Sequence, residues 1–130
     1  EGSELEAISQ KHGLDLIYLL APTSTGERIH LVAERSRGFI YLVSITGVTG
    51  ARDRLPADLK AFVTRVRKKA KQPLCIGFGI STPEQASQIA QIADGVIVGS
   101  RLIQLMEQED DLTSLTRLVR NLREAIDKLP

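Results

Sequence analysis

Short apolar runs alternate with amphipathic segments along the whole chain. Four apolar runs have the length of a strand and are bounded by glycine, proline or polar residues: 14–21, 39–43, 73–78 and 95–98. The segments around them repeat apolar residues at three- and four-residue spacings and predict helices: 3–12, 24–35, 56–71, 82–92, a short one from 101, and one from 110 or 111 to the end. One helix followed by four strand–helix units predicts a parallel sheet with right-handed crossovers.

Three of the predicted helices begin with a recognisable capping signal. Thr82, Pro83 and Gln85 supply an N-cap hydroxyl, a first-turn proline and the glutamine of a capping box. Two further segments have a serine three residues before a glutamate, which is the same spacing: Ser3 with Glu6, and Ser24 with Glu27.

The central run, 39–43, is nearly continuous in apolar residues, which predicts a strand covered on both faces. It opens into a loop that contains Gly47 and Gly50. Glycine lets a ligand approach the main chain closely. Barrels of the α/β class place their chemistry in such loops, at the carboxyl ends of the strands.

Residues 41–50, Tyr-Leu-Val-Ser-Ile-Thr-Gly-Val-Thr-Gly, closely resemble strand 6 and loop 6 of the tryptophan synthase α chain. Residues 77–81 (Gly-Phe-Gly-Ile-Ser) and 93–100 (Ala-Asp-Gly-Val-Ile-Val-Gly-Ser) agree with the same family. Residues 14–25, which end in Leu-Leu-Ala-Pro-Thr-Ser-Thr, resemble its strand 5 and the following loop. Four ordered matches cover essentially the whole chain.

The chain is about half as long as the family's fold requires. A complete (β/α)₈ barrel has about 250 residues, and this chain has 130. The alternating pattern alone is compatible with a flavodoxin-like sheet or with half a barrel. The resemblance favours a four-stranded parallel half barrel of the TIM-barrel family, with strands 5–8 in a single unit over residues 1–130.

Composition argues against several other classes. Seventeen basic and sixteen acidic side chains give a net charge of +1, and only five residues are aromatic, so neither charge nor stacking indicates nucleic-acid binding. No apolar run approaches the ~20 residues of a membrane span, and a single cysteine, Cys75, forms no internal disulfide. We therefore expect a cytoplasmic protein, or one of the plastid stroma if the source is a plant or alga.

Three glycine-bearing loops follow predicted strands and emerge on one face of the sheet: 47–50, 77–79 and 99–100. Free backbone amides there, with a helix N-terminus at Ser100, would form an anion pocket. Any one of these loops alone could be an ordinary tight turn. The resemblance implies that the phosphate of indole-3-glycerol phosphate is held by Gly50, Gly79, Gly99 and Ser100.

The resemblance also implies the remaining site residues. Ala21, Tyr41 and Phe78 would form part of the indole pocket, although each could equally be core packing. Thr49 matches the loop 6 threonine that meets a catalytic aspartate when the loop closes. Ile45 stands where some members carry arginine, so a loop-closing salt bridge at that position is not expected.

The family's reaction cleaves indole-3-glycerol phosphate to indole and glyceraldehyde 3-phosphate, using two carboxylates that lie upstream of anything in this chain. Such acid–base groups must reach the substrate by hydrogen bonds. Asp94 opens a strand, Glu84 lies in a helix's first turn, and Asp53 lies between two arginines, so none is a credible candidate. The segment alone is therefore expected to be inactive, with no cofactor, and the full-length protein to partner a tryptophan synthase β chain.

Other kinds of site have weaker support. His12 and His30 are far apart in sequence and have no second ligand at metal spacing, so no metal site is predicted. Cys75 lies within an apolar run and is interpreted as a small buried hydrophobe. The basic residues near the end of the 56–71 helix are interpreted as complementing its dipole rather than as a phosphate patch.

A second hypothesis is a stand-alone phosphate-binding half barrel that acts as a binding or assembly module. An open four-stranded sheet leaves two edges and an apolar face uncovered. Two copies could close an eight-stranded barrel as a homodimer, since two-fold contacts are the commonest in oligomers. Other phosphate-binding barrels share the glycine loops but lack the Thr-Gly-Val-Thr-Gly run.

Overall fold

The computed structural model describes residues 2–43 and 55–129. Helices and strands alternate in the predicted order, one helix followed by four strand–helix units and a final helix. Their bounds are α1 (Gly2–Lys11), β1 (Leu19–Leu20), α2 (Gly26–Arg35), β2 (Ile40–Val43), α3 (Leu59–Arg67), β3 (Leu74–Gly77), α4 (Pro83–Ala90), β4 (Gly95–Val96), α5 (Ser100–Gln108) and α6 (Thr113–Asp127).

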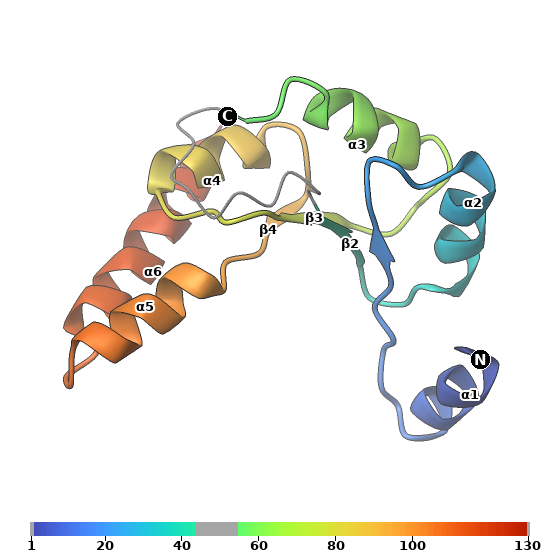
Figure 1. The fold of residues 1–130 in the computed structure, drawn as a ribbon, viewed down its shortest axis with the longest axis horizontal. Coiled ribbons are helices and arrows are strands. Elements are labelled where there is room, and N and C mark those ends of the chain that lie inside the picture. The colour runs from blue at the N-terminus through green and yellow to red at the C-terminus, as the bar shows by residue number, and fades with distance from the viewer. Residues whose placement is uncertain (1, 44–54, 130) are drawn as a thin grey trace.

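The four strands form one parallel sheet in the order β1-β2-β3-β4. Helices α2, α3 and α4 lie along one side of this sheet, whereas α1 and the α5–α6 pair extend from its two ends (Figure 1). Sequential order and a single hand of crossover are what half of a (β/α)₈ barrel requires. The predicted fold class is confirmed.

The face of the sheet that meets α2, α3 and α4 carries the core. Side chains from three neighbouring strands alternate onto this face with at most 1% of their surface exposed: Leu20, Ile40, Leu42, Leu74 and Ile76. Helix residues that pack into the same cluster are Ile29, Val32, Leu59, Phe62, Val63, Val66, Ala86 and Ile89. Their burial supplies most of the driving force for folding.

The opposite face of the sheet is less covered. The strand register aligns Leu19, Tyr41, Cys75 and Gly95 in one row across all four strands. Leu19 is 53% exposed, and the other three residues are half-buried. The prediction that the central strand is covered on both faces is therefore wrong for this chain, because the elements that would cover the second face of a barrel are not part of it. We call this surface the inner face.

Hydrogen bonds join the elements at the amino ends of the strands. Asp94, at the start of β4, accepts from the Leu74 backbone N–H at 2.8 Å and pairs with the Arg67 guanidinium of α3. The side-chain amide of Gln72 donates to the Ala33 and Ser36 carbonyls at 2.6 and 3.0 Å. These bonds tie the start of β3 to the helices on either side of it.

Ser36 is the buried centre of a second connection at this end. Only 1% of its surface is exposed. Its hydroxyl donates to the Phe39 carbonyl at 2.9 Å and accepts from the Tyr18 backbone N–H at 3.3 Å. One side chain thereby links the segment before β1 to the segment before β2.

The helix starts agree with the capping predictions in one of three cases. Thr82 and Gln85 form a complete capping box at α4. The N-cap of α2 is Thr25 instead of Ser24. The Ser24 hydroxyl accepts a hydrogen bond from the Ala21 N–H at 3.0 Å. Ser3 lies inside α1, and Glu6 accepts a hydrogen bond from the Tyr18 hydroxyl, so the third prediction is wrong.

The basic residues of α3 have structural partners. Arg65 donates to the Pro22 carbonyl at 2.6 Å, and Lys69 donates to the Gly26 carbonyl at 3.0 Å. Pro22 lies in the connection between β1 and α2, Gly26 is the first residue of α2, and Arg67 pairs with Asp94. These contacts favour a structural role for the cluster over a phosphate-binding one.

Candidate functional site

A cavity of about 170 Å³ lies at the carboxyl ends of β2, β3 and β4. Its lining combines inner-face side chains with the loops that follow β3 and β4. The lining residues are Tyr41, Gly77, Phe78, Gly79, Ile80, Ile97, Gly99 and Ser100. Carboxyl ends of parallel strands are where α/β barrels bind ligands.

The rim of the cavity at β4 is the start of a helix. Gly99 is the N-cap of α5 and, as a glycine, offers no side-chain cap to the first N–H groups of this helix. Such groups, together with the helix dipole, attract an anion. Gly79, which also lines the cavity, has a positive φ of 53°, a backbone conformation that glycine adopts without strain. Neither glycine places side-chain carbon between its main chain and the cavity.

The other residues that line the cavity are mainly aromatic and apolar. Tyr41 lies so close over Gly77 that a Cβ at this glycine would be 2.8 Å from the tyrosine Cζ and closer still to its hydroxyl oxygen. No ordinary Cβ contact is that short, so the position of the Tyr41 ring depends on a residue without a side chain. Phe78 and Ile97 also line the cavity. The lining therefore combines aromatic and apolar side chains with glycine main chain.

Five of the predicted site residues lie together around this cavity: Tyr41, Phe78, Gly79, Gly99 and Ser100. Ala21 is not among the lining residues; it is half-buried directly after β1. Thr49 and Gly50 lie outside the described residues, as do Ile45, Gly47 and Asp53.

Sequence analysis placed Gly77 only in a candidate anion-binding loop and did not single out Ile80 or Ile97, although all three line the cavity. Alternation along the strands would have found Ile97, because it lies two residues after Gly95 and so on the same face.

No carboxylate lines this cavity in the described part of the chain. Asp94 is held at the amino end of the sheet by Leu74 and Arg67. Burial raises the pKa of its carboxyl group, but the Leu74 N–H and Arg67 lower it by more, so the net pKa lies below its usual value. A carboxylate stabilised in its charged form at the far end of the sheet cannot reach a ligand in the cavity.

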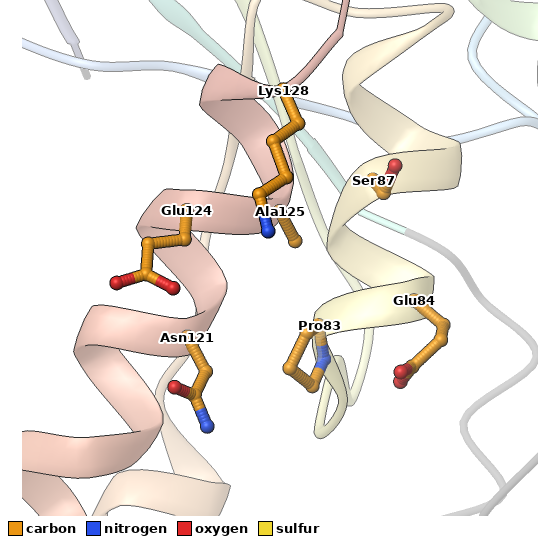
Figure 2. Close-up of a pocket in the computed structure, with 7 residues that line it drawn as sticks. All are labelled: Pro83, Glu84, Ser87, Asn121, Glu124, Ala125 and Lys128. Carbon is orange, nitrogen blue, oxygen red and sulfur yellow. The ribbon is translucent and has the colours of Figure 1, made fainter.

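Glu84 borders a different hollow, a groove of about 550 Å³ between α4 and α6 on the outer helix layer. Figure 2 shows Glu84 pointing away from α6, while Glu124 of α6 points away from α4. Two carboxylates that diverge do not form an acid–base pair around one substrate. The larger volume of this groove therefore does not make it the better candidate site.

Other chemistries lack support in residues 2–43 and 55–129. No group of three or more histidine, cysteine, aspartate or glutamate residues could hold a metal ion there. Burial, and secondarily the charge of Asp94, raise the pKa of the Cys75 thiol, which disfavours the nucleophilic thiolate. Within the same residues, no helix has both the length and the apolar character to cross a membrane.

The fold defines half of an α/β barrel, with a glycine-lined cavity at the carboxyl ends of its strands. A family model described as "Tryptophan synthase alpha chain" matches residues 1–128. This chain belongs to the tryptophan synthase alpha chain family, as the resemblance predicted.

Individual relatives agree with this assignment. The tryptophan synthase alpha chain of Dehalococcoides mccartyi is 58% identical over 127 residues, which cover 98% of this chain and 50% of the relative. That of Gloeobacter violaceus is 46% identical and covers 100% of this chain and 49% of its own length. The chain therefore spans about half the length of the curated relatives that it matches.

Solved structures give the same result. A structure of Mycobacterium tuberculosis tryptophan synthase superimposes with a TM-score of 0.88 at 41% identity, over 100% of this chain and 48% of that one. The tryptophan synthase alpha chain of Legionella pneumophila gives a TM-score of 0.83 at 37% identity, over 99% of this chain and 48% of that chain. The half barrel is thus matched at both the sequence and the structural level.

Proposed function

We propose that this chain supplies the phosphate site and part of the indole pocket of an enzyme that cleaves indole-3-glycerol phosphate to indole and glyceraldehyde 3-phosphate in tryptophan biosynthesis. The observation that carries this proposal is the cavity at the carboxyl ends of β2–β4, whose lining combines glycine main chain with the aromatic side chains of Tyr41 and Phe78. Such a lining suits a ligand that combines an anion with a flat apolar ring.

The residues divide between the two parts of that ligand. Main-chain amides around Gly79, Gly99 and Ser100 would bind the phosphate, helped by the N-terminal end of α5. Tyr41 and Phe78 would pack against the indole ring and exclude water from it. By resemblance, Gly50 would help to bind the phosphate and Ala21 would form part of the indole pocket. Thr49 would meet a catalytic aspartate when loop 6 closes.

The chemical step requires groups from outside this segment. One carboxylate must act as acid and base at the indole C3 and another must stabilise charge at the ring nitrogen, and the cavity presents neither in the described residues. The 130-residue chain alone is therefore expected to bind without cleaving. In the full-length protein we expect a β chain as partner, no cofactor of the α chain's own, and a cytoplasmic or plastid location.

The test is an amide-resolved NMR titration of the chain with indole-3-propanol phosphate, followed by indole and inorganic phosphate separately. Saturable shifts at Gly79, Gly99 and Ser100 with phosphate, and at Phe78 with indole, are the expected result. A dispersed spectrum that none of the three ligands changes at these residues would contradict the proposal. Release of indole from indole-3-glycerol phosphate by the purified chain would contradict the assignment of the acid–base groups to another segment.

A second candidate is a phosphate-binding half barrel that assembles as a homodimer. The uncovered inner face and the two-residue edge strands β1 and β4 favour it. The mass of the chain in solution tests this candidate, because a dimer has twice 14.3 kDa.

A further inference from the structure

Helix α5, which begins at the rim of the cavity, buries little of its own surface in this chain. Leu105 is its one buried side chain, whereas Ile103 and Met106 are 57% and 54% exposed. Within the described residues, α5 packs mainly on α6, and α6 in turn packs on α4 (Figure 1). The orientation of α5 therefore depends on how its far end is joined to α6.

The connection between α5 and α6 is held by a carboxylate. Glu109 directly follows α5, and its Oε2 accepts from the Ser114 N–H at 2.9 Å. Its Oε1 accepts from the Ser114 hydroxyl. The Ser114 hydroxyl and N–H lower the pKa of the Glu109 carboxyl group, which keeps it charged at neutral pH. Because Ser114 is the second residue of α6, one carboxylate joins the end of α5 to the first turn of α6.

The charge of Glu109 suits α6 and not α5. A helix dipole favours a negative charge near the amino end of a helix and disfavours one near its carboxyl end. Glu109 lies at the carboxyl end of α5 and bonds to the amino end of α6, where the charge of Arg117 also favours it. Its two bonds therefore hold α5 against α6 rather than stabilise α5 itself.

The backbone of Leu112, the N-cap of α6, is a second sign of a fixed connection. Its φ of 57° and ψ of 18° lie in the left-handed region, which is unfavourable for leucine. Such strain persists where neighbouring contacts over-determine the conformation. Bonds on both sides of Leu112 do so: Glu109 accepts from Ser114, and Asp111 Oδ1 accepts from the Thr113 N–H at 3.1 Å. The connection therefore holds one conformation.

We infer that Glu109 is a positioning residue for phosphate binding: through Ser114 it sets the angle of α5, and so the direction of the N–H groups at the start of this helix. The start of α5 is joined to β4 through residues 97–99, so a helix released at its far end would pivot there. Its first N–H groups would turn by the angle of the pivot, and hydrogen bonds weaken steeply when they are bent.

Glu109 acts at a distance from the ligand. Helix α5 has nine residues, a length of about 14 Å at ~1.5 Å per residue, so Glu109 does not touch a phosphate at Gly99 and Ser100. The inference rests on the proposed function, because it takes the phosphate site at these two residues as given.

Two explanations of Glu109 predict opposite signs. As a charge alone, the carboxylate would repel phosphate, and its removal would strengthen binding. As a positioning residue, it supports binding, and its removal would weaken it. Asp111 is the matched control, because it carries the same charge in the same connection but bonds only to Thr113, two residues ahead, and does not join α5 to α6.

The first test is an amide-resolved NMR titration of the chain and its variants with inorganic phosphate, indole-3-propanol phosphate and indole. Glu109→Ala should weaken both phosphate ligands about fivefold, because their charge-assisted hydrogen bonds are misaligned rather than lost. Indole should bind as before, since α5 supplies no part of the aromatic lining. Asp111→Ala should not weaken any of the three ligands. Glu109→Gln keeps an oxygen that can accept from Ser114 and should recover part of the loss.

Ser114→Ala tests the other side of the contact. It removes the hydroxyl donor without changing the charge, so it should weaken phosphate binding in the same direction as Glu109→Ala. Combining the two substitutions should add little, because the effects of bonded partners are not additive. Circular dichroism checks each fold, and Ser114→Ala replaces Glu109→Ala if the latter loses helix.

Residual dipolar couplings of the backbone N–H groups measure the angle between α5 and α6 directly. The couplings of α5 should change relative to those of α6 in Glu109→Ala and stay as in wild type in Asp111→Ala. A role in stability alone would lower the unfolding midpoint without changing this angle. Unchanged couplings, or an undiminished affinity for phosphate, would overturn the inference.

The same titration separates this inference from the proposed site. A wild-type chain that binds no phosphate ligand contradicts the site, and the inference falls with it. A wild-type chain that binds phosphate no more tightly than Glu109→Ala leaves the site standing and contradicts the inference alone.

Discussion

The two ends of the sheet use polar groups in opposite ways. At the amino ends, side chains such as Ser36, Gln72 and Asp94 pair with backbone groups of neighbouring elements. At the carboxyl ends of β2–β4, the cavity is lined by glycines, apolar side chains and one serine, and the capping position of α5 has no side chain. Polar groups that are paired within the protein stabilise the fold, whereas unpaired N–H groups at a helix N-terminus can bind an anion. The amino end therefore holds the fold together while the carboxyl end is left available for a ligand.

The largest expected difference between the two ends of the sheet is in the free energy of unfolding when one serine hydroxyl is removed at each end. Ser36→Ala leaves the part-buried Tyr18 N–H and Phe39 carbonyl without this partner, which should lower the free energy of unfolding by about 1–3 kcal/mol. Ser100→Ala removes an exposed hydroxyl and should change it by less than about 0.5 kcal/mol. Urea denaturation measures both, and equal losses would contradict the division between the two ends.

A methyl group at Gly77 should affect binding more than stability. It would displace the Tyr41 ring, because the Tyr41 Cζ lies only 2.8 Å from where the Cβ would be. The ring is on the partly open inner face and can move, so we expect a loss of about tenfold, or 1.4 kcal/mol, in affinity for indole-3-propanol phosphate. Calorimetry measures the affinity.

The double variant Gly77→Ala/Tyr41→Ala is the control for this mechanism. Without the ring, the added methyl meets no aromatic neighbour, so the two substitutions should not be additive. Additive losses would show that Gly77 acts on the ligand independently of Tyr41.

The smallest expected effect is a pH dependence at the amino end. The Leu74 N–H and Arg67 outweigh burial and lower the pKa of Asp94 in the folded chain. A lowered pKa stabilises the fold above the unfolded value of about 3.9, and this contribution is lost as the pH falls through the folded pKa. Because the Asp94 side chain is 46% exposed, the contribution should be below about 1 kcal/mol.

Asp94→Asn isolates this contribution from those of other carboxylates. The difference in unfolding free energy between wild type and variant should be largest near neutral pH and should shrink below about pH 4. A difference that stays constant with pH would mean that the charge of Asp94 does not contribute.

The parts of the fold that were predicted correctly depend on local signals. Thr82, Pro83 and Gln85 are close neighbours, and α4 begins where their pattern indicates. Alternation of strands and helices along the chain was sufficient for the order of the elements and for a parallel sheet. The family resemblance was still needed to choose between a half barrel and an open sheet, since both have this alternation.

The errors arise where a distant residue competes for a local group. Glu6 accepts a hydrogen bond from the Tyr18 hydroxyl instead of capping α1, and the pattern of apolar residues along the chain could not reveal this pair. Eight residues were predicted as the first strand, but only Leu19 and Leu20 pair with β2. The close approach of Tyr41 to Gly77 was missed, because it depends on a side chain from another strand.

From Tyr41 through Cys75 to Gly95, the side chains of the row on the inner face become smaller towards β4. Gly77 and Ile97, two positions further along their strands than Cys75 and Gly95, contribute to the lining of the cavity one layer above this row. Cys75 and Gly95 are not themselves among the lining residues. A larger side chain at either position would therefore reshape the cavity from beneath without becoming part of its lining.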